Sequence, residues 1–167
     1  MKCIDRKDFI MSIKPESTSV LTEEQKDMLF FIYQEEKMAR DVYITFDRVY
    51  KNENTFRLMQ IAEQRHLDCA RKLCEFYGVD TSSVDETVVG AFESPVLKTL
   101  YEAYTERGKN SLRDALEIAE FIEATDINMI EHASVGMPSD VVAVYEKLKR
   151  GNLNHLDIFQ TAISRAA

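Results

Sequence analysis

Apolar side chains recur every three or four residues along four long segments of the chain, which is the spacing of one face of an α-helix. These segments cover residues 22–50, 55–78, 112–133 and 141–164. Thr22 with Gln25 has the sequence signature of a capping box, and Ser111 and then Ser139 or Asp140 stand where the later segments begin. The pattern therefore predicts four long helices, each with a polar residue at its start.

The connection between the second and third segments is long. Residues 79–94 follow no helical spacing, and Ser94-Pro95 then begins a short predicted helix that extends to about Arg107 and is closed by Gly108. Antiparallel neighbouring helices are joined by loops of about two to eight residues, so this connection indicates a crossover along the bundle. We therefore predict an all-α, ferritin-like four-helix bundle with one long crossover that carries an extra short helix.

Composition and charge narrow the class of protein. The 167 residues include only 5 glycines and 3 prolines, too few turn residues for a sandwich or barrel of short strands. With 29 acidic against 21 basic side chains the net charge is −8, whereas nucleic-acid binding rests on a basic face. One bundle domain is expected over residues 21–167, after an N-terminal extension of residues 1–20.

Features that govern localisation indicate a reducing compartment. No segment approaches the ~20 apolar residues that span a bilayer, and charges interrupt the stretch that would form the apolar part of a signal peptide. The 3 cysteines form no CxxC pair and have no zinc-finger spacing. We expect a cytoplasmic protein that binds neither membrane nor nucleic acid and has no structural disulfide.

Turning each predicted helix by about 100° per residue shows which polar residues share its apolar face. Six do so near the middle of the helices: Glu36, Glu63, His66, Glu123, Asp126 and His155. The same construction points Glu35 and Cys69 outward and places Arg40 at the flank of its helix. An unpaired carboxylate in a core is costly, so the six inward residues need partners.

The charges of these residues indicate what the partners are. Glu36, Glu63, Glu123 and Asp126 would repel one another and become protonated unless cations lie among them. Two divalent ions neutralise four carboxylates, and two imidazoles can join as neutral ligands. The i, i+3 spacing of Glu63 and His66 brings both side chains to one helix face, where a bridging carboxylate and a terminal imidazole can serve one metal pair. The set predicts a dinuclear metal site.

Each candidate also has a purely structural interpretation. Glu36 can pair with Arg40 one turn away in a solvated groove. His66 can be a core imidazole that is bonded to a backbone carbonyl, and His155 can join neighbouring helices. Asp126 can mark a kink or a local cap.

Four blocks of sequence, LTEEQKDMLFFIYQEEKMARDVY, AEQRH, FIEATDI and GNLNHL, carry a resemblance to a known family. In this order, from about Leu21 to Phe159, the chain resembles an uncharacterised family of ferritin-like proteins that are relatives of rubrerythrin. In that superfamily the first helix supplies a Glu ligand, the second a Glu-x-x-His pair, the third a Glu, and the fourth another Glu-x-x-His pair.

Carried over by position, the resemblance implies five metal ligands: Glu36, Glu63, His66, Glu123 and His155. Tyr43, two turns after Glu36, resembles the tyrosine that many members place beside the metals, and its alternative role is ordinary core packing. The chain departs from the superfamily pattern at Asn152, which stands three residues before His155 where a Glu is expected. Asp126, one turn beyond Glu123, is the candidate for the missing charge.

The resemblance implies a non-haem di-metal protein that is redox-active with O2 or peroxide, as a rubrerythrin-like peroxidase or a ferroxidase. Iron is the expected metal, with manganese or zinc as alternatives. Rubrerythrin itself carries a rubredoxin domain with paired CxxC motifs, which this chain lacks, so a separate electron-donor protein is expected. A homodimer is expected by the same resemblance. The alternative is a non-catalytic helical bundle that binds metal for stability or binds a partner.

Overall fold

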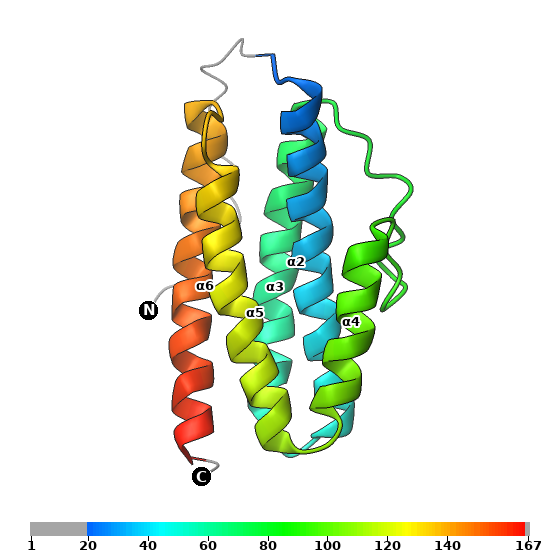
Figure 1. Cartoon of the computed structure of the whole chain (residues 1–167), viewed down its shortest axis with the longest axis vertical. Coiled ribbons are helices and arrows are strands. Elements are labelled where there is room, and N and C mark those ends of the chain that lie inside the picture. The colour runs from blue at the N-terminus through cyan, green and yellow to red at the C-terminus, as the bar shows by residue number, and fades with distance from the viewer. Residues whose placement is uncertain (1–19, 166–167) are drawn as a thin grey trace.

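The computed structural model describes residues 20–165, which form five helices and no strand. The helices are α2 (Glu23–Val49), α3 (Asn54–Phe76), α4 (Pro95–Gly108), α5 (Leu112–Ala133) and α6 (Ser139–Arg165). The four long helices lie side by side with their axes roughly aligned, and the shorter α4 lies beside them (Figure 1). The prediction of an all-helical chain is confirmed, and the expected N-terminal extension falls almost wholly outside the described residues.

The helices begin where the sequence places polar caps. Thr22 accepts a hydrogen bond from the backbone amide of Gln25, whose side chain accepts one from the Thr22 amide, so the predicted capping box forms. Gly78 follows α3 with a φ of 68°, a left-handed conformation that favours glycine. Gly108 is the last residue of α4 rather than a residue beyond it, and a Cβ there would overlap the ring of Phe46.

The core consists of two apolar clusters, one toward each end of the bundle. One cluster joins the start of α2 to the end of α3 and the start of α6, with Leu29, Leu73 and Val144 among its members. The other includes Phe46, Phe56 and Phe159, and the ring of Phe56 contacts both of the other rings. Along each long helix, the polar residues predicted as metal ligands lie between members of one cluster and members of the other. A polar layer therefore interrupts the apolar core at mid-length.

The crossover of residues 79–94 covers the side of α2 that faces away from the other long helices (Figure 1). The Lys37 ammonium lies 2.6 Å from the Asp41 carboxylate, and neither side chain is exposed. Lys37 also donates to the carbonyl of Val88, and Asp41 accepts from the backbone amide of Gly90. Gln34 accepts from two further amides at the end of the crossover. A short buried charge network therefore fastens the crossover to α2.

Packing on more than one side of α2 and of α3 corrects three expectations. Glu35 and Cys69 were expected to point outward and Arg40 to lie at the flank, yet their exposed fractions are 1 %, 8 % and 5 %. α2 contacts α3, α4 and α5, and α3 contacts both α2 and α6, so the buried arc of each helix is wider than one stripe. A single apolar face is therefore a poor guide to burial on these two helices. None of the described helices has the length and apolar content needed to cross a membrane.

We expect Asp41→Asn to destabilise the protein by about 3–5 kcal/mol, because it leaves the buried Lys37 ammonium without its counter-charge. The measurement is urea denaturation at pH 7, compared at unchanged slope. Glu23→Gln is the matched control, since it removes the partner of Lys26 from an exposed ion pair on the same helix. Equal losses in the two variants would contradict a structural role for the buried network.

Candidate metal centre

Seven ionisable side chains form the polar layer between the two apolar clusters. Six are the residues predicted from the sequence and the seventh is Glu35: Glu35 and Glu36 from α2, Glu63 and His66 from α3, Glu123 and Asp126 from α5, and His155 from α6. All are at least nine-tenths buried except His66, whose side chain is 14 % exposed. The fold therefore gathers residues that lie as far as 120 positions apart in the sequence.

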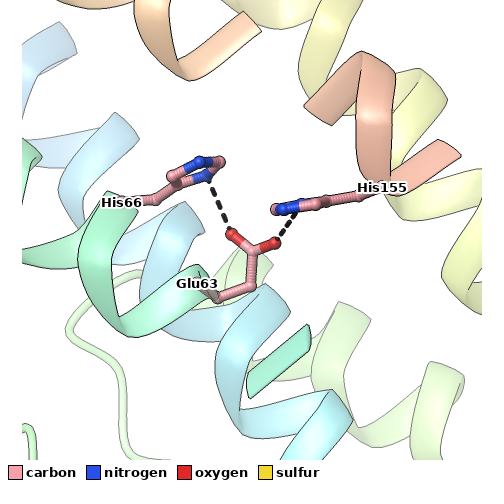
Figure 2. Close-up of side chains that lie close together, drawn as sticks. All are labelled: Glu63, His66 and His155. Atoms are coloured by element: carbon pink, nitrogen blue, oxygen red, sulfur yellow. Dashed lines mark ion pairs between the residues drawn. The ribbon is translucent and has the colours of Figure 1, made fainter. Parts of the chain in front are cut away.

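Glu63 lies at the centre of this layer. Figure 2 shows its carboxylate between two imidazoles, with Oε2 3.1 Å from His66 Nδ1 and Oε1 2.7 Å from His155 Nδ1. The two rings are stacked, with centroids 5.1 Å apart and an angle of 23° between their planes. One ligand atom from each of these three residues lies within 4.8 Å of the others. A single carboxylate thus faces imidazoles from two different helices.

Each imidazole also faces a second carboxylate. His66 Nδ1 lies 3.3 Å from Glu36 Oε2, and His155 Nδ1 lies 3.4 Å from Glu123 Oε2. The layer consequently contains two sets of donors that share Glu63. Each set has one imidazole nitrogen, one carboxylate of its own and one oxygen of the shared carboxylate.

Several polar atoms of these two sets have no hydrogen-bond partner. They are both carboxylate oxygens of Glu36, Glu63 Oε1, Glu123 Oε2, and the Nδ1 atoms of His66 and His155. The nitrogens and oxygens are close, but their directions do not satisfy hydrogen-bond geometry. Buried polar atoms are normally paired, and imidazole nitrogens with carboxylate oxygens are the donors that divalent iron, manganese and zinc accept. The residues present therefore fit a metal centre.

The protonation states of the polar layer depend on the burial of its members and on their mutual charges. Burial alone would raise the pKa of Glu63, but the adjacent His66 and His155 lower it overall. Burial opposes the charged form of His155, yet Glu63 and Glu123 outweigh it and raise its pKa to about 10. The pKa of His66 is likewise raised, against burial, by Glu63 and Glu36. Without cations the imidazoles hold protons, and metal binding must displace them.

Tyr43 lies beside the second donor set, where its hydroxyl donates a 2.7 Å hydrogen bond to Glu123 Oε1. Tyr43 is fully buried, and burial followed by the charge of Glu123 raises its pKa well above the usual range. The hydroxyl thus keeps its proton and fixes the orientation of a carboxylate. Its predicted catalytic role stays a prediction.

Glu35 and Asp126 form a separate carboxyl pair at the α2–α5 side of the layer. The two carboxyl groups lie close enough to shift each other's pKa, and burial raises the pKa of Glu35 to about 8. The pKa of Asp126 is raised well above its usual value by burial and then by the charge of Glu35. The pair therefore retains one proton near neutral pH. Asp126 thus has a carboxyl partner, and its predicted role as a metal ligand stays a prediction.

No signal in the helical spacing could have found Glu35, because α5, which carries its partner Asp126, packs against this side of α2. The alternative pairing of Glu36 with Arg40 is not what the structure has. The Arg40 guanidinium instead donates to Asp41, to Gln64 and to the carbonyl of Glu86. His155 does join helices, through its contacts with Glu63 and Glu123.

Two neighbouring residues of α6 complete the layer. Gly151 lies against the His66 ring, and a Cβ at this position would overlap Nε2 and Cε1 of that ring. Asn152 is 1 % exposed, and neither its Nδ2 nor its Oδ1 has a hydrogen-bond partner. α6 thus places the backbone of Gly151 against the His66 ring and the unpaired amide of Asn152 one residue further along.

Comparison with known proteins shows the family of this chain. Residues 25–166 match the model of an uncharacterized protein domain, DUF2202. The chain belongs to this family. The uncharacterized protein MJ0754 of Methanocaldococcus jannaschii is 34 % identical over 140 residues, which are 83 % of this chain and 75 % of that protein. The crystal structure of hypothetical protein MJ0754 matches with a TM-score of 0.85 and 31 % identity, over 90 % of this chain and 85 % of that chain.

These matches confirm that the chain belongs to an uncharacterised family, and the solved relative has the same fold. Both the DUF2202 domain and MJ0754 are uncharacterised. The polar layer is therefore the feature that bears on the chemistry of this DUF2202 chain.

In this DUF2202 protein we expect Gly151→Ala to cost about 1–3 kcal/mol, because the added methyl group must displace the His66 ring. The cost should be smaller in a His66→Ala background, where the obstructing ring is absent. A double-mutant cycle of urea unfolding measures this coupling. An equal cost in both backgrounds would contradict the contact. Asn154→Ala, at an exposed position three residues along α6, is the control for general effects on the helix.

The Glu35–Asp126 pair predicts a pH dependence of metal-free stability. A folded-state pKa near 8 lies above the unfolded value, so the folded state binds more protons and loses stability as pH rises toward 8. With EDTA present, the unfolding free energy should fall less between pH 5 and pH 8 in Glu35→Gln than in wild type. Glu106→Gln, at an exposed position on α4, should follow wild type. Parallel pH profiles for Glu35→Gln and wild type would refute the assignment.

Proposed function

We propose that this chain is a ferritin-like, non-haem di-metal carboxylate protein that is redox-active with O2 or peroxide. The observation that carries the proposal is the position of Glu63 between His66 and His155, each of which faces a further carboxylate. Two metal ions would use all of these donors, held by the carboxylates and imidazoles of Glu36, Glu63, His66, Glu123 and His155. In this proposal Glu36 and His66 hold one ion, and Glu123 and His155 hold the other.

Charge supports two divalent ions rather than one. Three carboxylates contact the imidazoles, and the Glu35–Asp126 pair with its shared proton carries a fourth negative charge. Two divalent ions neutralise this layer once the imidazoles are neutral ligands. A single divalent ion would leave two negative charges that retained protons would have to neutralise.

Iron is the metal we propose, with manganese or zinc as alternatives for the same donors. Bound iron would supply the electrons for reduction of O2 or peroxide, in a peroxidase or ferroxidase reaction. The chain's residues have supporting roles. Tyr43 holds Glu123 in place by its hydrogen bond, and the apolar clusters on both sides of the layer limit access of water.

Partners follow from this chemistry and from the resemblance to rubrerythrin relatives. The reaction needs a reductant, and we propose a separate electron-donor protein as its source. A homodimer in the cytoplasm belongs to the same proposal.

A second candidate is a non-catalytic helical bundle that binds metal for stability alone or binds a partner. One observation favours it: without metal, the carboxylates and protonated imidazoles of the layer already form ion pairs with one another. A structural site would raise the melting temperature with added metal by mass action and show no reaction with O2.

The test is an anaerobic Fe(II) titration followed by exposure to O2. We expect about two irons per chain, from the two donor sets, and a ferric absorption band that develops with O2. Glu63→Ala/His66→Ala should lose both signals, because it removes the shared carboxylate and one imidazole. Glu131→Ala/His132→Ala is the matched control, since it removes an exposed Glu and an exposed His from α5.

Each other outcome has a definite meaning. Binding of two metals that only raises the melting temperature would favour the structural site over the redox enzyme. Absence of stoichiometric binding of iron, manganese and zinc would overturn the proposal. Equal loss of binding in the Glu131/His132 control would show that the effect of the Glu63/His66 variant is not specific to the layer.

A further inference from the structure

α3 and α6 each carry a polar residue three positions before a histidine, as Glu63-x-x-His66 and Asn152-x-x-His155. The two helices run in opposite directions (Figure 1) and contact each other. Their histidine rings stack. An approximate twofold relation therefore links the two pairs. On α3 the first member is the carboxylate that faces both imidazoles, whereas on α6 the corresponding position holds a neutral amide.

The Asn152 amide is buried without a partner. Its exposed fraction is 1 %, and both Nδ2 and Oδ1 lack hydrogen bonds. The adjacent Gly151 lies against the His66 ring, so this turn of α6 is level with the metal centre. Leaving a buried polar group without a hydrogen bond is unfavourable, and this amide has two such groups. A bound group that pairs with the amide would remove this cost.

We propose that Asn152 marks the binding position of a small exogenous anion on the α6 side of the metal pair, with Nδ2 donating a hydrogen bond to it. The inference rests on the proposed function, because the anion binds to the metals. A cation alone would satisfy Oδ1 but not the Nδ2 donor. A group that accepts a hydrogen bond from Nδ2 and also binds metal would satisfy this donor, and a small anion with several lone pairs does both.

The distribution of charge and the available space also favour an anion on the α6 side. The Glu63 side of the pair supplies a negative carboxylate to both imidazole positions, whereas the Asn152 side supplies none. On the α6 side an anion could therefore bind the metals without like-charge repulsion from that helix. The deep burial of Asn152 restricts the anion to a few atoms.

The experiment uses the full chain loaded with Co(II), whose visible spectrum reports coordination, and azide as the probe anion. Azide should bind wild type saturably. Asn152→Leu removes the donor and should weaken azide binding by about tenfold, the value of a hydrogen bond to a charged group. Asn152→Asp is nearly isosteric and places a negative charge where the anion would lie, so it should weaken azide binding at least as much.

Asn154→Leu is the matched control, since Asn154 is exposed two residues further along α6, and it should bind azide as wild type does. Cobalt stoichiometry is measured for every variant. Two cobalt ions with no azide binding, or with equal azide affinity in wild type and both Asn152 variants, would overturn this inference and leave the metal centre intact. Failure of wild type to bind cobalt and iron would overturn the inference together with the proposed function.

Discussion

Five carboxyl groups and two imidazoles lie in one buried layer at the middle of this bundle, and their charges must be neutralised for the chain to fold. In the metal-free chain protons contribute to this on the imidazoles and on the Glu35–Asp126 pair, and burial raises the pKa values of Glu36 and Glu123 so that these carboxyls also favour the protonated form. The flanking apolar clusters hold the four helices in a register at which the seven side chains meet.

α2 carries two buried polar clusters, and their difference indicates their roles. In the first, Lys37, Arg40 and Asp41 bond to one another and to the crossover backbone, so the charged groups have direct partners. In the second, both oxygens of Glu36 lie within the layer without a hydrogen bond. The first cluster is closed and fastens the chain. The second has donor atoms left over, which is the property of a site that binds something else.

Local signals predicted the helices because caps such as Thr22 and breaks such as Gly78 act within a few residues. The six inward residues could be predicted because each lies on the apolar face of its own helix. Glu35 could not, since it faces α5, which packs on α2 from far along the chain. The pairing of Asp126 with Glu35 depends on the same tertiary packing. Family membership gave the fold of a relative but no chemistry.

Stability alone gives little reason for such a layer. Replacing a buried charge network with apolar residues of similar volume is often neutral or stabilising. This DUF2202 chain instead interrupts its apolar core with Glu63 between two imidazoles and leaves the Asn152 amide unpaired. The Lys37–Asp41 network shows that the same helix can bury charge with its partners supplied. Unpaired donors in the central layer are therefore best explained by ligands that arrive from outside the chain, first cations and then the small anion that completes their coordination.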